Sequence, residues 1–352
     1  MGDRIRIGVL GGAGEAAEGH IRGFQADQRA EVTALWDIDD TKVRARATSL
    51  AVPHVVDSAE ALVAHADVDA VVVATPDHRH ADHAALALEA GRHVLCEKPT
   101  STTRADAARL VELVRRTGRI FLGGHVYHFR PDYQRLQQAY RRGDIGKAWM
   151  VEGDYVSNLQ QMYGPSGRTP WRSDASAPQD IMLGGGCHPM GLMRWVLQEE
   201  VTEVTAYSNH LAEPLLPVDD CYVAIMRFEG GAIGRLSAAA GSRGKVPDGG
   251  HIKVRGTTGS LWNTQLYRDD NEHHSPHPIR DFGYETKHLG PRVNDTTQVH
   301  YWAEQASHFL DCIQGRAEPM TTVLDTARVV AALTACVESA RTGRAVIVDT
   351  TF

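Results

Sequence analysis

The sequence of 352 residues lacks long apolar runs, an excess of positive charge and recognisable targeting segments. No apolar stretch approaches the roughly 20 residues of a membrane-spanning helix. The formal net charge of −7 argues against nucleic acid or an anionic membrane as the main partner. Glycines interrupt the N-terminal segment too early for a secretory signal peptide, and position 6 is not the serine or threonine of a myristoylation motif. These absences predict an ordinary soluble globular protein.

Paired cysteines are also missing. The chain has five cysteines, an odd number, and none of them belongs to a CxxC pair. This pattern predicts reduced thiols and a cytoplasmic location. His273, His274 and His277 lack zinc-site spacing and cysteine partners, so we expect residues 268–300 to form a long loop and no metal site.

Residues 71–99 predict two parallel strands joined by a helix. Residues 71–74 are a β-branched run that stops at Thr75-Pro76, and residues 93–96 are a second apolar run. The segment between them has helical composition and ends at Gly91. A strand–helix–strand unit implies parallel strands, and ligands bind beyond the carboxyl ends of such strands. Thr75-Pro76 and Lys98 both fall at such ends.

Lys98 stands between Glu97 and Pro99 at the end of the second of these strands. Most lysines are solvated loop residues, but a lysine at a strand end can donate a hydrogen bond to a substrate hydroxyl. Ala-Thr-Pro-Asp-His-Arg-His at residues 74–80, followed by Glu-Lys-Pro at 97–99, resembles the signature of the glucose–fructose oxidoreductase and inositol dehydrogenase (Gfo/Idh/MocA) family.

This resemblance implies an α/β fold. An N-terminal Rossmann domain with a doubly wound parallel sheet is followed by an α+β domain with an open, mostly antiparallel sheet. The signature residues that the resemblance places at the cofactor are Thr75, Pro76, His78, His80, Glu97 and Lys98.

A glycine-rich turn, Gly11-Gly12-Ala13-Gly14, joins the first predicted strand to an alanine-rich helix. In this context backbone N–H groups approach a pyrophosphate at the helix N-terminus, although glycine clusters also mark ordinary turns. Asp37 ends the second strand, where an acidic residue accepts hydrogen bonds from the ribose hydroxyls of NAD, or caps the next helix. No arginine stands directly beside Asp37 to hold a 2′-phosphate, so we expect NAD as the cofactor.

The first domain is expected to close near residue 124, after a short strand over residues 120–124. Five later strands are predicted at residues 149–157, 201–208, 222–228, 232–239 and 251–255. Glu229-Gly230-Gly231 is a hairpin turn signal between two of them, and short turns give an antiparallel sheet. We expect an NAD-binding domain over residues 1–124 and a substrate-binding and oligomerisation domain over residues 125–352.

His188 follows Gly184-Gly185-Gly186-Cys187 and lies at or just before a predicted helix N-terminus. It either caps that helix or moves a proton. The resemblance aligns His188 with the family's catalytic histidine, and Gly184 with an aspartate that members carry four residues earlier. Asp180 is a candidate substitute for this missing carboxylate.

Trp171-Arg172 resembles a family substrate-loop motif, and an aromatic ring with a guanidinium suits a sugar and its hydroxyls. The candidate substrate-binding residues are Lys98, His125, Tyr127, Arg130, Trp171, Arg172, Asp180 and His188.

The expected function is an NAD-dependent oxidation of a secondary hydroxyl in a sugar, cyclitol or glycoside. Lys98 would polarise the oxygen and His188 would take its proton. Because His188 follows three glycines and has lost its orienting aspartate, we expect Lys98 to matter more. The alternatives are a redox-neutral glycoside-cleaving enzyme with tightly bound NAD and a non-catalytic nucleotide-sensing regulator.

The second sheet is expected to leave one face uncovered by its own helices, and family members pair through that face. We therefore expect a homodimer or homotetramer. The residues that could supply the paired face are Val223, Ile225, Met226, Ile233 and Leu236.

Overall fold

The computed structural model describes residues 4–177, 180–243, 250–263, 265–268, 277–278 and 301–352. Within it the chain divides into two compact units. The first unit comprises Met1–Val126, Thr296–Val330 and Phe352, and the second comprises Tyr127–Asp295 and Ala331–Thr351.

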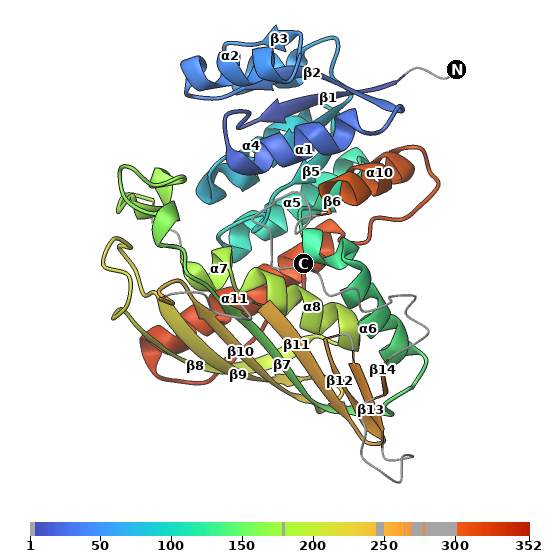
Figure 1. Ribbon diagram of the computed structural model, residues 1–352, viewed down its shortest axis with the longest axis vertical. Helices are drawn as coiled ribbons and strands as arrows, with labels where there is room; N and C mark the ends of the chain where they lie inside the picture. Colours follow the sequence, from blue (N-terminus) through green and yellow to red (C-terminus); the bar gives the residue numbers. More distant parts are fainter. Residues whose placement is uncertain (1–3, 178–179, 244–249, 264, 269–276, 279–300) are drawn as a thin grey trace. The chain divides into compact units, whose positions relative to one another are not determined.

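The first unit is built on a six-stranded sheet with the order β3-β2-β1-β4-β5-β6, and every pair of neighbours is parallel. This arrangement confirms the predicted doubly wound sheet (Figure 1). Its strands are β1 (Ile5–Leu10), β2 (Ala30–Trp36), β3 (His54–Val55), β4 (Ala70–Val73), β5 (His93–Cys96) and β6 (Phe121–Gly123). All four residues of β4 are buried, as expected for a parallel strand that is covered on both faces.

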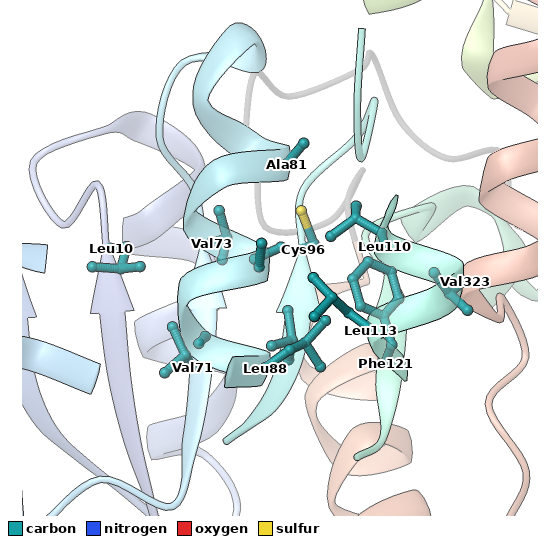
Figure 2. Close-up of a cluster of buried hydrophobic side chains, with 14 of the residues drawn as sticks. Leu10, Val71, Val73, Ala81, Leu88, Cys96, Leu110, Leu113, Phe121 and Val323 are labelled. Atoms are coloured by element: carbon teal, nitrogen blue, oxygen red, sulfur yellow. The ribbon is translucent and has the colours of Figure 1, made fainter. Parts of the chain in front are cut away.

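Helices pack against this sheet and enclose its core. They are α1 (Glu15–Gln25), α2 (Asp40–Ser49), α3 (Ala59–Ala64), the 3₁₀ turn η1 (Asp77–Arg79), α4 (His80–Glu89) and α5 (Arg104–Thr117). Figure 2 shows one core cluster, in which side chains of β4 and β6 meet those of α4 and α5. Thr103 caps the N-terminus of α5, because its Oγ1 accepts from Asp106 N at 3.0 Å. Helix α5 ends at Gly118, whose φ is +64°.

The expected second domain over residues 125–352 differs from the observed division, because the described residues 301–330 belong to the first unit. Helix α10 (Trp302–Ile313) packs along α1 within this unit. Gly19 of α1 makes the close approach possible, because a Cβ there would overlap the indole ring of Trp302. Helix α11 (Val323–Thr342) begins in the first unit and continues in the second.

The second unit contains a nine-stranded sheet with the order β14-β13-β12-β11-β7-β10-β9-β8-β15. Its pairs are antiparallel except that β10 runs parallel to β7, which agrees with a mostly antiparallel sheet. The strands are β7 (Ala148–Val156), β8 (Val201–Asn209), β9 (Cys221–Phe228), β10 (Ile233–Ala239), β11 (Gly250–Gly256), β12 (Gly259–Trp262), β13 (Gln265–Arg268), β14 (His277–Pro278) and β15 (Val346–Ile347). The five strands predicted from the sequence are all present, with bounds shifted by one or two residues.

The helical segments of this part of the chain are η2 (Val126–Phe129), α6 (Pro131–Arg141), η3 (Gln160–Met162), η4 (Pro170–Ser173), α7 (Ile181–Gly184) and α8 (Cys187–Leu197). Of these, α6 and α8 have 11 residues each, and the others are single turns. Helices α7 and α8 pack on one face of the sheet, and α11 runs along it as well (Figure 1).

The two faces of the second sheet differ in composition. Val223 and Ile225 of β9 are 45% and 55% exposed, and Ile233 of β10 is exposed beside them. Met226 and Leu236 were predicted on this open face but are buried on the opposite one. The reason is the period of two along a strand, which sends residues of even and odd number to opposite faces here.

Among the described residues, no helix is both long and apolar enough to cross a bilayer. The predicted loop over residues 268–300 lies almost wholly outside the described residues, as do His273 and His274, whereas His277 opens strand β14.

Candidate functional site

The glycine-rich turn lies directly after β1. Gly11 adopts a φ of +83°, and a Cβ there would overlap the backbone at Ala74, so only glycine fits. The N–H groups of Gly11 and Gly12 both donate to Trp36 O at 2.9 Å, which ties the turn to the end of β2. Helix α1 then begins at Glu15 without a side-chain cap at Gly14. An uncapped first turn with its positive dipole end is suited to an anionic group such as a pyrophosphate.

Asp37 follows β2 and is half-buried beside this turn. Its Oδ2 accepts from Ala13 N and its Oδ1 from Asp39 N, both at 3.0 Å. The carboxylate therefore braces the glycine-rich turn and has further lone pairs for other donors. Asp39, and not Asp37, caps α2 by accepting from Lys42 N.

The cations near Asp37 are engaged with other acids. Lys42 pairs with Asp39 at 2.7 Å and Arg44 with Asp40 at 2.9 Å. Arg46, which the sequence analysis did not consider, reaches back from α2 to the carbonyl of Gly14 at 3.3 Å and to Glu18 at 3.1 Å. Arg46 lies nine residues after Asp37, and nothing in the sequence indicates that it contacts the glycine-rich turn.

The carboxyl ends of β4 and β5 carry the family signature. Thr75 is buried and its Oγ1 lies 3.0 Å from His83 Nδ1. His80 was predicted to contact the cofactor, but it is 1% exposed and both of its ring nitrogens lie 2.7 Å from backbone carbonyls, those of Thr75 and Pro99. Its role is therefore structural at these strand ends, whereas His78 is exposed on η1.

Glu97 extends β5, with its N–H donating to Val73 O at 2.8 Å. Its side chain is buried, with Oε1 2.8 Å from His20 Nε2 and Oε2 accepting from Lys98 N at 3.0 Å. Burial alone would raise the pKa of Glu97, but the hydrogen bond and charge of His20 outweigh it and hold that pKa at about 2. Glu97 is therefore a fixed anion beside the half-buried Lys98. His125 is buried just after β6.

His188 lies in the first turn of α8, as predicted, and is 5% exposed. Its ring stacks with those of Tyr127 and Tyr155, at centroid distances of 4.2 and 5.6 Å and interplanar angles of 23°. Burial raises the pKa of Tyr127, so this neighbour is a neutral phenol. Tyr155 was missed in the sequence, because nothing in a β-strand tyrosine indicates a histidine partner from a distant helix.

One of the glycines before His188, Gly185, provides space beside its ring. Gly185 has an α-helical backbone, with φ −110° and ψ −48°. A Cβ at Gly185 would overlap the ring of Tyr155. The absence of this atom lets the tyrosine ring lie beside the imidazole, so His188 is held more firmly than its glycine-rich approach predicted.

Asp180, the candidate replacement for the missing aspartate, is the N-cap of α7. Its Oδ1 accepts from Met182 N and its Oδ2 from Tyr222 Oη, both at 2.7 Å. Burial raises the pKa of Asp180 to about 6 in spite of these bonds. Both oxygens thus serve the second unit's own structure.

The remaining predicted residues form cation–π contacts. The guanidinium of Arg130 lies 5.4 Å from the centre of the Tyr127 ring and pairs with Asp132 at 2.6 Å. That of Arg172 lies 4.6 Å from the centre of the Trp171 ring in η4. The structure thus brings Arg130, Tyr127 and His188 together.

Comparison with known proteins agrees with both halves of this arrangement. The model described as "Oxidoreductase family, NAD-binding Rossmann fold" matches residues 5–125, and that described as "GFO/IDH/MocA C-terminal domain" matches residues 133–262. The chain belongs to the Gfo/Idh/MocA family. The resemblance predicted from residues 74–80 and 97–99 is confirmed.

Individual relatives share modest identity with this family member. Inositol 2-dehydrogenase 2 of Saccharopolyspora erythraea is 31% identical over 65% of this chain and 65% of its own length. The chain spans less than two thirds of the length of that relative and of inositol 2-dehydrogenase from Acidothermus cellulolyticus, where the match covers 57%. The 1,5-anhydro-D-fructose reductase of Ensifer adhaerens is 26% identical over 98% of this chain and 99% of its own.

Solved structures share the fold over nearly the full length. An oxidoreductase domain protein from Kribbella flavida superposes with a TM-score of 0.85 at 22% identity, covering 99% of this chain and 100% of its own. A scyllo-inositol dehydrogenase from Lactobacillus casei, solved with NAD(H) and scyllo-inositol, gives 0.80 at 19% identity, covering 98% and 99%.

The raised pKa of Asp180 predicts a pH-dependent stability. Between about pH 4 and pH 6 the native carboxyl keeps a proton that the unfolded chain releases, so the free energy of unfolding falls as pH rises through this window. Asp180→Asn should remove this contribution, of about 3 kcal/mol, and should be at least as stable as the natural protein at pH 7. Urea denaturation at pH 4 and pH 7 measures it.

Tyr222→Phe serves as the companion variant. It removes a hydrogen bond that lowers the pKa of Asp180, so the pH range over which the free energy of unfolding falls should extend to higher pH. An equal pH dependence in the natural protein and in Asp180→Asn would show that Asp180 does not titrate in this window.

Proposed function

We propose that this protein is an NAD-dependent dehydrogenase that oxidises a secondary hydroxyl of a sugar, cyclitol or glycoside. The observation that carries the proposal is Lys98 at the carboxyl end of β5, between a buried anion and a buried proline, in a Rossmann domain. The relatives named as inositol dehydrogenases and a sugar reductase support a polyhydroxylated substrate.

The first unit suits NAD. The turn at Gly11–Gly14 and the uncapped start of α1 would hold the pyrophosphate, and Asp37 would accept from the adenosine ribose hydroxyls. Thr75 and Pro76 would border the same cofactor. When bound, NAD accepts the hydride that leaves the carbinol carbon.

The side chains would handle the hydroxyl. Lys98 donates a hydrogen bond to the carbinol oxygen and stabilises the negative charge that develops there. His188 accepts the hydroxyl proton. The substrate contacts would come from His125 of the first unit and from five residues of the second unit: Tyr127, Arg130, Trp171, Arg172 and Asp180.

A nucleotide-sensing regulator is the second candidate. Gly184 in place of the family's aspartate favours it, since that carboxylate would share in proton transfer. A screen of sugars and cyclitols for NADH formation separates the two, because a regulator binds NAD without turnover. If NAD co-purifies and a glycoside is cleaved with no added cofactor, the redox-neutral alternative holds instead.

The five cysteines are free thiols, which supports our proposal of a reducing compartment, the cytoplasm. We also propose that the protein acts on a small molecule alone, with neither nucleic acid nor membrane as a partner.

Asp37 leads to a prediction on cofactor choice. It would repel a 2′-phosphate, so NAD should bind at least about tenfold more tightly than NADP, or about 1.4 kcal/mol. Asp37→Asn should narrow that ratio, while Glu112→Gln, at an exposed acid of α5 that pairs with Arg115, should leave it unchanged. Isothermal titration with both cofactors measures the two affinities. Equal affinities in the natural protein would contradict the proposed contact of Asp37 with the ribose.

Lys98 should be more critical to turnover than His188. Lys98→Ala should abolish measurable oxidation while NAD still binds, because the developing alkoxide loses its donor. His188→Ala should leave a slow rate, about 100-fold reduced, at the low end for general acid–base catalysis. Steady-state rates on one substrate measure both, with the exposed Lys42→Ala as the control. Near-normal turnover in Lys98→Ala would exclude the mechanism.

The open face of the second sheet, with Val223, Ile225 and Ile233 exposed, supports our proposal of a homodimer or homotetramer. Ile225→Arg should shift the protein to monomer in light scattering at micromolar concentration, because it buries a charge in the contact. Ile38→Arg, at an exposed isoleucine of the first unit, is the matched control. A natural protein that is already monomeric at this concentration would contradict the proposal.

A further inference from the structure

Two histidines that the proposed mechanism does not use contact the residues directly before and after Lys98, His20 at Glu97 and His80 at Pro99. His20, in α1, is 0% exposed, and His80, at the start of α4, is 1% exposed. We propose that His20 and His80 are positioning residues that clamp residues 97–99 from two helices and thereby place the Lys98 amine. This inference rests on the proposed dehydrogenase function for its kinetic test only.

The first half of the clamp runs through Glu97. A carboxylate only accepts, so Nε2 of His20 donates to Oε1 across the 2.8 Å contact. The other oxygen accepts from the N–H of Lys98 at 3.0 Å. His20 is fixed in turn by helix α1 and by the indole of Trp302, whose ring centre lies 6.0 Å away. A displacement of the His20 imidazole would therefore displace the Lys98 backbone through the Glu97 side chain.

The second half acts on the next residue and on the neighbouring strand end. His80 Nδ1 lies 2.7 Å from Pro99 O, and Nε2 lies 2.7 Å from Thr75 O. Carbonyl oxygens only accept, so both ring nitrogens must carry hydrogen for both bonds to form. The ring thereby joins the chain after β5 to the chain after β4.

The two contacts are complementary in what they restrain. The Glu97 side chain holds the N–H of Lys98, and His80 holds the carbonyl oxygen of Pro99, the next residue. The lysine side chain then starts from a backbone with little freedom, which is what a donor aimed at one substrate oxygen requires. Helix α1 also starts at the glycine-rich turn, so the clamp links the cofactor side of the domain with the lysine.

The experiment compares kcat with the dissociation constant of NAD. His20→Leu removes the donor, whereas His20→Gln keeps an N–H at a similar reach. We expect kcat to fall about 10- to 100-fold in His20→Leu and in His80→Gln, NAD affinity to stay within about threefold, and His20→Gln to recover most of the rate. His93→Leu, which removes a histidine bond to Ile120 N at the other end of β5, should lower stability and leave kcat unchanged.

Two readouts are independent of turnover and so survive a failure of the proposed function. Nitrogen NMR of the natural protein should show hydrogen on both ring nitrogens of His80. Hydrogen exchange of the Lys98 amide should accelerate more than about tenfold in His20→Leu, relative to amides in β1. A single ring N–H on His80, unchanged Lys98 exchange, or equal loss of kcat in His20→Leu and His20→Gln would overturn the clamp.

Discussion

The parallel register of β4 with β5 is the constraint on which the first unit's chemistry depends. Val73 and Cys96 are partners, and the N–H of Glu97 continues the ladder to Val73 O. The residues after each strand therefore emerge side by side, and His80 can join them. A slip of one residue would turn the buried valines of β4 to the other face and separate Thr75 from the lysine segment.

Two buried carboxyl groups show how local donors decide the charge of an acid. Glu97 faces the imidazole of His20, and its pKa is lowered to about 2 although burial opposes this. Asp180 accepts from the uncharged donors Tyr222 Oη and Met182 N, and burial raises its pKa to about 6. The first acid is thus a permanent anion that orders a lysine backbone. The second can exchange a proton near neutral pH, at a cost to stability when it ionises.

Much of the fold could be predicted because strong local patterns coincided with the real elements. The β-branched run at residues 71–74 and the glycine-rich turn at residues 11–14 are such patterns. The return of α10 to the first unit was missed, although Gly19 in a helix interior is a sign of close packing. His20 was missed because its partner lies 77 residues away. Contacts of that range follow from the assembled sheet and leave no trace in a short window.

The surroundings of His188 separate two effects that a carboxylate would normally combine. An aspartate beside a histidine fixes the ring and also favours its protonated form. Here the rings of Tyr127 and Tyr155 stack with the imidazole at 23°, so packing supplies the orientation. Stacked aromatic rings do not replace the charge of a carboxylate, however. In the proposed mechanism, glycine at position 184 would therefore remove an electrostatic contribution to proton uptake by His188 while packing keeps the geometry, as expected of a base that assists the reaction beside a dominant lysine.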